Sequence, residues 1–170
     1  MERSSPPQDQ DDADLVTGIG LLGIDHVGVA VADLDAAVAF YEQVFGMRCV
    51  HRETNEEQGT YEAMMAVGHR GAEGGYLQLL APVAAESVIG RFLDRRGPGI
   101  HQVAYQVADV EAASAALRAR GVRLLYDEPR RGTAGTRVNF VHPKDAGGVL
   151  VELVEPATQT TPPGPPAPAR

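Results

Sequence analysis

The chain has 170 residues, of which 44% are hydrophobic and 5% aromatic, and its formal net charge is −8 at pH 7. Fifteen Lys and Arg residues stand against 23 Asp and Glu residues, which excludes the basic face that nucleic-acid binding requires. No apolar stretch is long enough to span a bilayer, so we expect no membrane partner either.

The two ends differ in composition from the middle. Residues 1–18 are polar and acidic and lack the basic and apolar regions of a signal peptide, which predicts a disordered leader. Residues 157–170 are Pro-rich, which predicts a disordered tail. We therefore expect one domain over residues 19–156. The only cysteine, Cys49, excludes an internal disulfide and favours a reducing cytoplasm.

Apolar spacing and turn residues predict the elements in chain order. Asp33 and Asp109 are typical helix caps, and Gly46 and Gly121 are typical helix ends. The first half is predicted to contain strands near 23–32, 47–54, 60–67 and 75–81 and a helix near 34–45. A bridging helix near 86–95 leads to predicted strands near 100–107, 122–126, 136–141 and 148–155 and a helix near 110–120.

The two halves repeat one another. The string IDHVGVAVADLDAAVAFY begins at Ile24, and the altered copy GIHQVAYQVADVEAASAAL begins at Gly99. Aligning Asp33 with Asp109 gives an offset of 76 residues. The repeat predicts an α+β fold of two tandem βαβββ modules, about 21–82 and about 99–156, joined by a bridging helix at about 86–96.

Strand alternation decides which side chains enter the cleft between the halves. His26 shares a face of its strand with the small residues Gly28 and Ala30, which leaves space beside the imidazole. In the second half Gln102 takes the corresponding face, and His101 takes the face that packs under a helix. The offset of 76 also places His26 opposite Gln102. We therefore expect Gln102, rather than its neighbour His101, to point into the cleft.

Two further polar residues interrupt apolar strands, Gln78 and Glu152, each in the last strand of its half. A buried carboxylate is costly unless a cation or several donors meet it. We expect one imidazole, two amides and one carboxylate to converge, a set that suits a divalent ion such as cobalt, manganese, nickel or zinc. The predicted metal ligands are His26, Gln78, Gln102 and Glu152.

Each of these residues taken alone has a structural alternative. A single strand histidine is more often a hydrogen-bonded core residue, and a single glutamine often satisfies backbone groups at a sheet edge. The segment Arg130–Arg137 has a similar pair of interpretations, because its cationic and backbone donors suit an anionic ligand but also a solvated loop.

The sequence resembles the vicinal oxygen chelate (glyoxalase/bleomycin resistance-like) family, and within it the methylmalonyl-CoA epimerases. The resemblance covers residues 21–155 and includes IDHVGVAV, NEEQGTYEAMM, YLQLLAP, GVRLLYDEPRRG and NFVHPKDAGGVLVEL. It implies a half-open, barrel-like sheet around a metal-binding cleft, and it also implies a homodimer.

Carried over position by position, the resemblance makes His26, Gln78 and Glu152 metal ligands and Glu62 an acid-base residue. The chain departs from the family at one point. The second module of the family usually has a pair of histidines, of which the second is the ligand, whereas this chain has His101–Gln102. Gln102 would have to bind through its amide oxygen, which is a harder and weaker donor than imidazole.

The implied activity is a metal-dependent epimerisation that interconverts the (2R) and (2S) forms of methylmalonyl-CoA, an acyl-CoA substrate of propionyl-CoA metabolism. Two groups must flank the reacting carbon, and we expect Glu62 and Glu152 to be these catalytic residues. A cation near the developing enolate would stabilise its charge. Glu53, Glu56 and Glu57 are expected to lie at the surface.

Two other functions remain compatible with the sequence. One is a glyoxalase-like, metal-dependent isomerase that acts on a thiol adduct. The other is a metal-free, ligand-sequestering protein of the drug-resistance type, which Gln102 keeps open because an amide is a poor replacement for a ligating imidazole.

Overall fold

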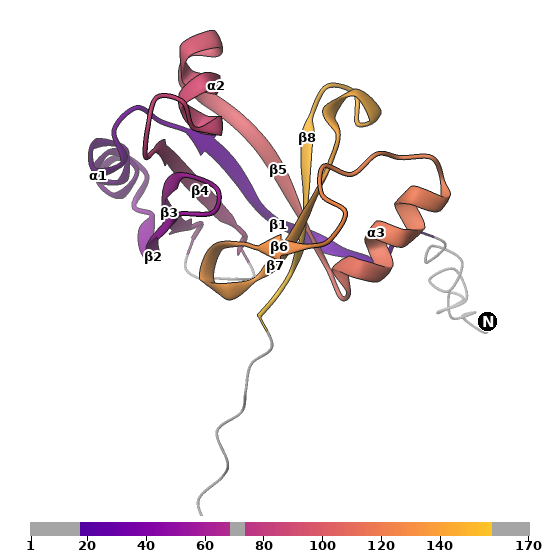
Figure 1. The fold of residues 1–170 in the computed structure, drawn as a ribbon. Helices are drawn as coiled ribbons and strands as arrows, with labels where there is room; N and C mark the ends of the chain where they lie inside the picture. Colours follow the sequence, from indigo (N-terminus) through magenta and orange to yellow (C-terminus); the bar gives the residue numbers. More distant parts are fainter. Residues whose placement is uncertain (1–17, 69–73, 158–170) are drawn as a thin grey trace, which may run out of the picture.

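The computed structural model describes residues 18–68 and 74–157, and its strands form one mixed, eight-stranded sheet in the order β2-β3-β4-β1-β5-β8-β7-β6 (Figure 1). The predicted leader and tail lie almost wholly outside these residues. The elements are, in chain order, β1 (Leu21–Ala30), α1 (Leu34–Phe45), β2 (Arg48–Asn55), β3 (Thr60–Ala66), β4 (Tyr76–Pro82), α2 (Val88–Arg96), β5 (Gly99–Val107), α3 (Val110–Ala119), β6 (Arg130–Arg131), η3 (Thr133–Gly135), β7 (Arg137–Val141), η4 (Pro143–Asp145) and β8 (Leu150–Glu155).

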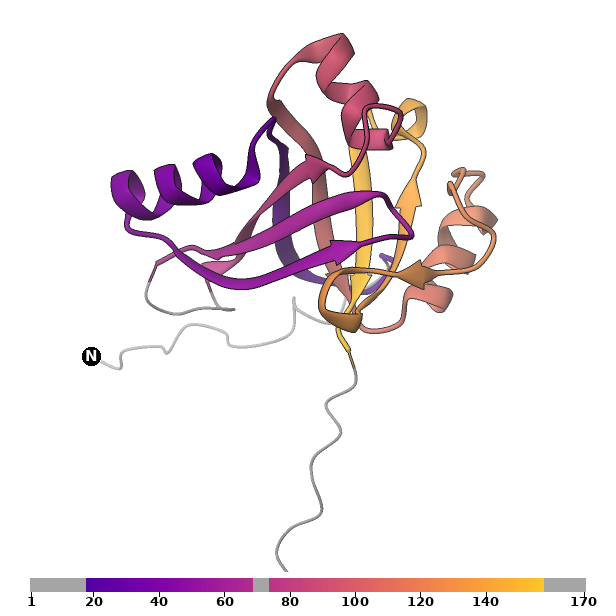
Figure 2. The same cartoon turned by 60° about the vertical axis from the view of Figure 1, so that its left-hand side comes forward.

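The repeated halves meet edge to edge at the centre of the sheet. β1 pairs antiparallel with β5, and each of these strands pairs in parallel with the last strand of its own half, β1 with β4 and β5 with β8. In Figure 2 the magenta strands of the first half cross in front of the later strands, as expected for a strongly curled sheet. The predicted α+β fold of a half-open, barrel-like sheet is therefore confirmed.

The helices begin where the capping residues predict. Asp33 Oδ1 accepts from Ala36 N at 2.9 Å, and Asp109 Oδ1 accepts from Ala112 N at the same distance. Gly46 ends α1 with a φ of 65°, a backbone conformation that favours glycine. None of the described helices is long and apolar enough to cross a membrane.

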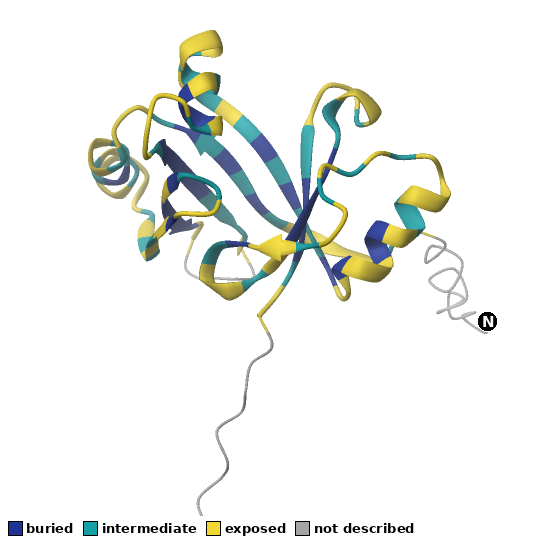
Figure 3. Cartoon of the chain, viewed as in Figure 1, coloured by how far each residue is buried: buried dark blue, intermediate teal, exposed yellow. Residues whose placement is uncertain are grey.

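The curled sheet has a helix-covered side and a concave side. The buried cluster under α1 comprises Val38, Ala63, Met65 and Leu79, and the cluster under α3 comprises Val107, Val110, Ala113 and Leu153. Because side chains alternate along a strand, the strand residues that alternate with these clusters point to the concave side. The alternating buried bands on the central strands in Figure 3 follow this pattern. α2 closes one end of the concave side, where Ile89 packs on Ala30 and Leu80.

The prediction of a strand at residues 122–126 is wrong. Only an isolated bridge at Leu124 joins this segment to β7, and the strand that does form is the short β6. Leu125 N donates to Phe140 O and Arg123 O accepts from His142 N, but the pairing extends no further, and the carbonyl of Tyr126 is used by side chains. Tyr126 O accepts from Arg118 Nη2 at 2.8 Å and from Asn139 Nδ2 at 3.1 Å. These contacts are tertiary, so the local apolar pattern did not reveal them.

Candidate active site

Four neighbouring strands at the centre of the sheet each direct one polar side chain to the concave side. The four are His26 on β1, Gln78 on β4, Gln102 on β5 and Glu152 on β8, and we name them the cleft cluster. Each of them is at most 4% exposed. The structure thus brings together the four residues that the sequence predicted to converge.

Glu152 Oε2 is the point at which the cleft cluster meets. Gln102 Nε2 donates to this oxygen over 2.7 Å, and His26 Nε2 lies 3.2 Å from it. Gln102 Nε2 also donates to Gln78 Oε1 over 3.3 Å. The four side chains are therefore close enough to surround one small ion.

Gln102, rather than His101, enters the cleft cluster. His101 Nδ1 contacts Gln102 Oε1, whereas the other end of the amide, Nε2, faces Glu152. The His101 ring stands edge-on to Phe92 with 5.0 Å between the ring centroids. Gly28, opposite Gln102 on β1, leaves the space that the amide occupies, since a Cβ there would lie 2.8 Å from Gln102 Cδ. Burial lowers the pKa of His101, which favours its neutral form.

The chemistry of the cleft cluster fits a divalent ion. His26 Nε2 is buried and makes no well-aligned hydrogen bond, although Glu152 Oε2 lies 3.2 Å away. Asp25 Oδ1 lies 2.8 Å from His26 Nδ1, an arrangement that orients ligating imidazoles. The cluster adds two amide oxygens and one carboxylate. Among the described residues no three His, Cys, Asp or Glu side chains are placed so that they alone could hold a metal ion, so an ion here would depend on the amide oxygens of Gln78 and Gln102.

The electrostatics of His26 also favour a positive charge at this point. Burial opposes the imidazolium form, but the carboxylates of Asp25 and Glu152 outweigh it and raise the pKa of His26 to about 9. In the absence of a metal, a proton on His26 partly balances the buried carboxylate. A bound cation would take the place of that proton.

Glu62 on β3 lies beside the cleft cluster and is 1% exposed. Thr60 Oγ1 donates to Glu62 Oε1 over 2.5 Å, and Gln78 Nε2 lies 3.5 Å from Glu62 Oε2. Burial raises the pKa of Glu62 and nearby carboxylates add to this effect, although hydrogen bonds from two threonine hydroxyl groups oppose it. A carboxyl group in such surroundings suits proton transfer near neutral pH.

The segment 132–136 crosses from the second half to the first, and we name it the strap. Thr133 Oγ1 accepts from Gln78 Nε2 over 2.7 Å and donates to Glu62 Oε2. Ala134 N donates to Glu53 Oε2 over 3.1 Å, and Ala134 adopts a φ of 54°. Thr133 lies in the stretch Arg130–Arg137, for which the sequence allows either an anionic-ligand site or a solvated loop, and no local pattern marks Thr133 as a partner of Glu62.

The expectation for Glu53 was wrong, because its side chain is only 14% exposed. Glu53 on β2 lies opposite Glu62 on β3 in the strand register, and the strap covers Glu53. His51 Nε2 lies 2.7 Å from Glu53 Oε2. Glu56 and Glu57 are exposed, as predicted.

Two cavities adjoin the cleft cluster. One of about 200 Å³ is lined by residues that include His26, Glu152 and Thr133. The other, of about 310 Å³, is lined by residues that include Gln102 and Arg130. The guanidinium carbon of Arg130 lies 3.9 Å from the ring centroid of Tyr126, which places a cation at this second cavity.

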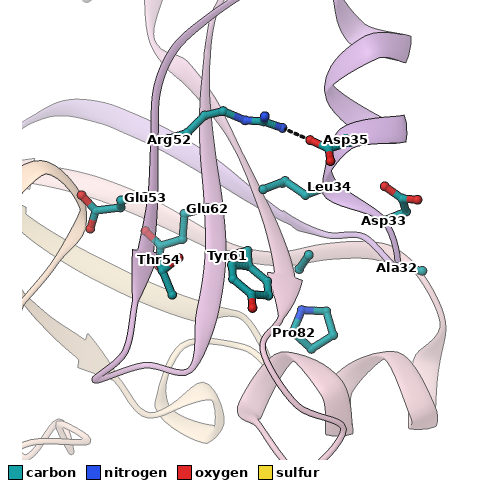
Figure 4. A pocket seen from close by; sticks show the side chains of 11 residues that line it. Ala32, Asp33, Leu34, Asp35, Arg52, Glu53, Thr54, Tyr61, Glu62 and Pro82 are labelled. Carbon is teal, nitrogen blue, oxygen red and sulfur yellow. Dashed lines mark hydrogen bonds and ion pairs between the residues drawn. The ribbon is translucent and has the colours of Figure 1, made fainter.

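A larger cavity, of about 550 Å³, lies between the start of α1 and strands β2 and β3. Its lining includes none of the cleft cluster. Figure 4 shows that Glu53 and Glu62 belong to this lining and that Arg52 reaches Asp35 at the same cavity. The conjunction of buried polar groups, rather than cavity size, therefore identifies the candidate site.

Known proteins resemble this chain over most of its length. Residues 25–140 match the model of the Glyoxalase/Bleomycin resistance protein/Dioxygenase superfamily. The mitochondrial methylmalonyl-CoA epimerase of Homo sapiens is 36% identical over 153 residues, which cover 88% of this chain and 81% of that protein.

Two solved structures extend the comparison. The crystal structure of methylmalonyl-CoA epimerase from Mycobacterium tuberculosis shares 53% identity with a TM-score of 0.80, over 85% of this chain and 93% of that one. A methylmalonyl-CoA epimerase in complex with methylmalonyl-CoA and NH4+ shares 49% identity with a TM-score of 0.78, over 82% and 97%. The chain therefore belongs to the glyoxalase/bleomycin resistance protein/dioxygenase superfamily, and within it to the methylmalonyl-CoA epimerases, which are isomerases.

Proposed function

We propose that the chain interconverts the (2R) and (2S) epimers of methylmalonyl-CoA. The observation that carries this proposal is the position of Glu62, a buried carboxyl group of raised pKa, beside a cluster with the chemistry of a metal site. One related structure, 49% identical, is described as a complex with methylmalonyl-CoA, which supports the same substrate here.

The reaction needs a proton to leave one face of the α-carbon and another to reach the opposite face. In the proposed mechanism, Glu62 takes or returns the proton on its side. Thr60 and Thr133 orient the carboxyl group of Glu62 through their hydroxyl groups. Burial removes competing water and brings the proton affinity of Glu62 closer to that of the enolate.

We propose Glu152 as the second acid-base group. Its contacts with Gln102 and His26 all use Oε2, which leaves Oε1 for a proton. In this scheme Glu152 has two functions, because Oε2 also faces the point at which a metal would bind. A carboxylate that binds a dication is a weaker base, so Glu62 is the stronger base of the pair.

We propose that His26, Gln78, Gln102 and Glu152 hold a divalent ion, of which cobalt, manganese, nickel and zinc are the candidates. When bound, the ion supplies positive charge that stabilises the enolate oxygen and the substrate carboxylate. The chain's own residues fix the position of that charge, because the four side chains come from four adjacent strands.

In the proposed function the acyl-CoA substrate reaches the cluster through the cavity of about 310 Å³. Arg130 at this cavity provides a cation for the phosphate-bearing part of the thioester. This is the anionic-ligand interpretation of the segment Arg130–Arg137.

We further propose one domain over residues 19–156, a homodimer, and a place in propionyl-CoA metabolism in the cytoplasm. The single Cys49 supports a reducing compartment.

Leu21, Leu22 and Ile24 on β1 are 51%, 63% and 62% exposed, and a dimer contact would cover such an apolar strip. Size-exclusion chromatography with light scattering tests the oligomeric state, and a monomeric mass would contradict the dimer.

The experiment that tests the activity follows exchange of the substrate α-hydrogen with deuterated solvent by mass spectrometry. Protein treated with chelator and then loaded with manganese or cobalt is expected to exchange the hydrogen and to interconvert the epimers. A chelated sample is the control. Metal-loaded protein that leaves the α-hydrogen in place would overturn the proposal, and turnover of a glutathione hemithioacetal instead would favour a glyoxalase-like isomerase.

A further inference from the structure

We propose that His101 is a positioning residue that sets the orientation of the Gln102 amide, so that Gln102 Oε1 can face a divalent ion in the cleft cluster. The inference rests on the proposed function, because it assumes a divalent ion at that point. His101–Gln102 stands at the position where the family that the sequence resembles usually has a pair of histidines.

The present contacts turn the wrong end of the amide toward the ion position. Gln102 Nε2 faces Glu152 Oε2 at 2.7 Å and Gln78 Oε1 at 3.3 Å, while Gln102 Oε1 contacts His101 Nδ1 behind it. An amide N–H group repels a cation, whereas an amide oxygen binds one. Metal binding through Gln102 therefore requires the two ends of the amide to exchange places.

A half turn about the last side-chain bond achieves this exchange with little displacement. The amide nitrogen and oxygen are similar in size, so the turned side chain fills the same space. Larger movement is restricted, because Gly28 lies directly against the Gln102 side chain and even a Cβ there would come within 2.8 Å of Gln102 Cγ. The edge-on contact with Phe92 holds the His101 ring in place.

His101 can pair with the amide in both orientations. A neutral imidazole has one N–H group and one nitrogen acceptor, and the proton can reside on either nitrogen. With the proton on Nδ1, His101 donates to Gln102 Oε1. With the proton on Nε2, His101 Nδ1 accepts from Gln102 Nε2, and the amide oxygen then points at the ion.

Without such an acceptor, the turned amide would leave a buried N–H group unpaired. That loss is costly, since Gln102 is 4% exposed. His101 therefore stabilises the metal-binding orientation even though it does not itself touch the ion. Outer partners of this kind typically change metal affinity by about 10-fold to 100-fold.

The test measures Mn²⁺ binding to the full chain by isothermal titration calorimetry, with the variants His101→Leu and His101→Asn. His101→Leu removes the acceptor, and we expect Kd for Mn²⁺ to rise by about 10-fold or more. His101→Asn retains a side-chain oxygen near the Nδ1 position, and we expect it to restore most of the affinity. Nitrogen-15 NMR of His101 should show its proton moving from Nδ1 to Nε2 when diamagnetic Zn²⁺ is added.

A purely structural role would give a different pattern. If His101 acted only by packing against Phe92, the smaller Asn would weaken binding as much as Leu, and that result would overturn the inference. Unchanged Mn²⁺ affinity in His101→Leu would overturn it as well. If the unmodified chain bound neither Mn²⁺ nor Co²⁺, the metal part of the proposed function would fail first, and the inference with it.

Discussion

At the scale of single residues, the candidate site consists of polar side chains whose burial is costly unless they contact one another or a ligand. Glu62 and Glu152 are both nearly inaccessible, and both contact glutamine side chains. Gln102 contributes only an amide where imidazole would bind transition metals more strongly. In the proposed function Glu62 acts in proton transfer and Gln102 in metal choice, and each of these two roles can be tested by one substitution.

Glu62→Gln is expected to abolish base catalysis but to leave metal binding intact. The amide keeps the shape of the carboxyl group and cannot accept the α-proton, so hydrogen exchange should fall by about 100-fold or more. Exchange is measured by mass spectrometry, and bound metal by elemental analysis. Glu56→Gln, at an exposed position of the same approach, is the matched control. Full exchange by Glu62→Gln would remove Glu62 from the mechanism.

Gln102→His is expected to shift metal preference toward zinc and cobalt relative to manganese. Imidazole nitrogen favours these borderline ions, whereas amide oxygen favours harder ones. We expect the ratio of the Zn²⁺ and Mn²⁺ dissociation constants to change by about tenfold, the size typical of altered metal surroundings. Competition titrations measure the ratio, and an unchanged ratio would mean that Gln102 is not a ligand.

At the scale of elements, short-range signals predicted most helices and strands but not the segments that depend on distant partners. Asp33 and Asp109 marked the starts of α1 and α3 because an N-cap acts within one helical turn. The segment 122–126 has an apolar strand pattern, yet it forms only an isolated bridge at Leu124, and Asn139 and Arg118 both donate to Tyr126 O. The strap likewise has no signal of its own in the sequence, since Thr133 meets Gln78 and Glu62 only through contacts with the other half.

The ion pair between Arg123 and Asp145 predicts a pH-dependent contribution to stability. Arg123 donates from N, Nε and Nη2, and these contacts hold the pKa of Asp145 well below its ordinary value near 3.8. A lowered carboxyl pKa stabilises the fold above the ordinary value, and this contribution is lost as the pH falls further.

Asp145→Asn is therefore expected to lower the urea midpoint at neutral pH and to differ less from the unmodified chain at strongly acidic pH. Urea unfolding at the two pH values measures this difference. Asp35→Asn is the control, because the Asp35 side chain that pairs with Arg52 is 86% exposed and solvent screens it. An equal difference at both pH values would contradict the role of the Arg123 pair.

At the scale of the whole molecule, the cleft cluster joins the two halves of the sheet. His26 and Gln78 come from the first half, and Gln102 and Glu152 come from the second. A bound ion would therefore link parts of the chain that are far apart in sequence, and it would bind the folded state in preference to the unfolded one.

Divalent metal is accordingly expected to raise the melting temperature in a concentration-dependent way. At a free concentration of about 100 times Kd, the stabilisation is about 2.7 kcal/mol, which corresponds to a shift of about 5–10 °C. Differential scanning fluorimetry with Mn²⁺ and chelator measures the shift. Glu152→Gln should abolish it and Glu56→Gln should keep it, whereas a shift that survives in Glu152→Gln would place the ion elsewhere.

The repeat, the helix caps and the faces of the strands can be predicted from the order of the residues. These follow from interactions within a few residues and from the fixed alternation of side chains along a strand. That alternation, together with the offset of 76, was sufficient to predict that His26 and Gln102 lie on one side of the sheet.

The completion of the candidate site depends on contacts between segments that are far apart in the sequence. The strap places Thr133 on Glu62 and covers Glu53 through a hydrogen bond from Ala134 N. Each of these contacts joins residues whose meeting depends on how the sheet curls and where the connecting segments cross it. Local composition has no information about such crossings, because they are set by the packing of the whole sheet.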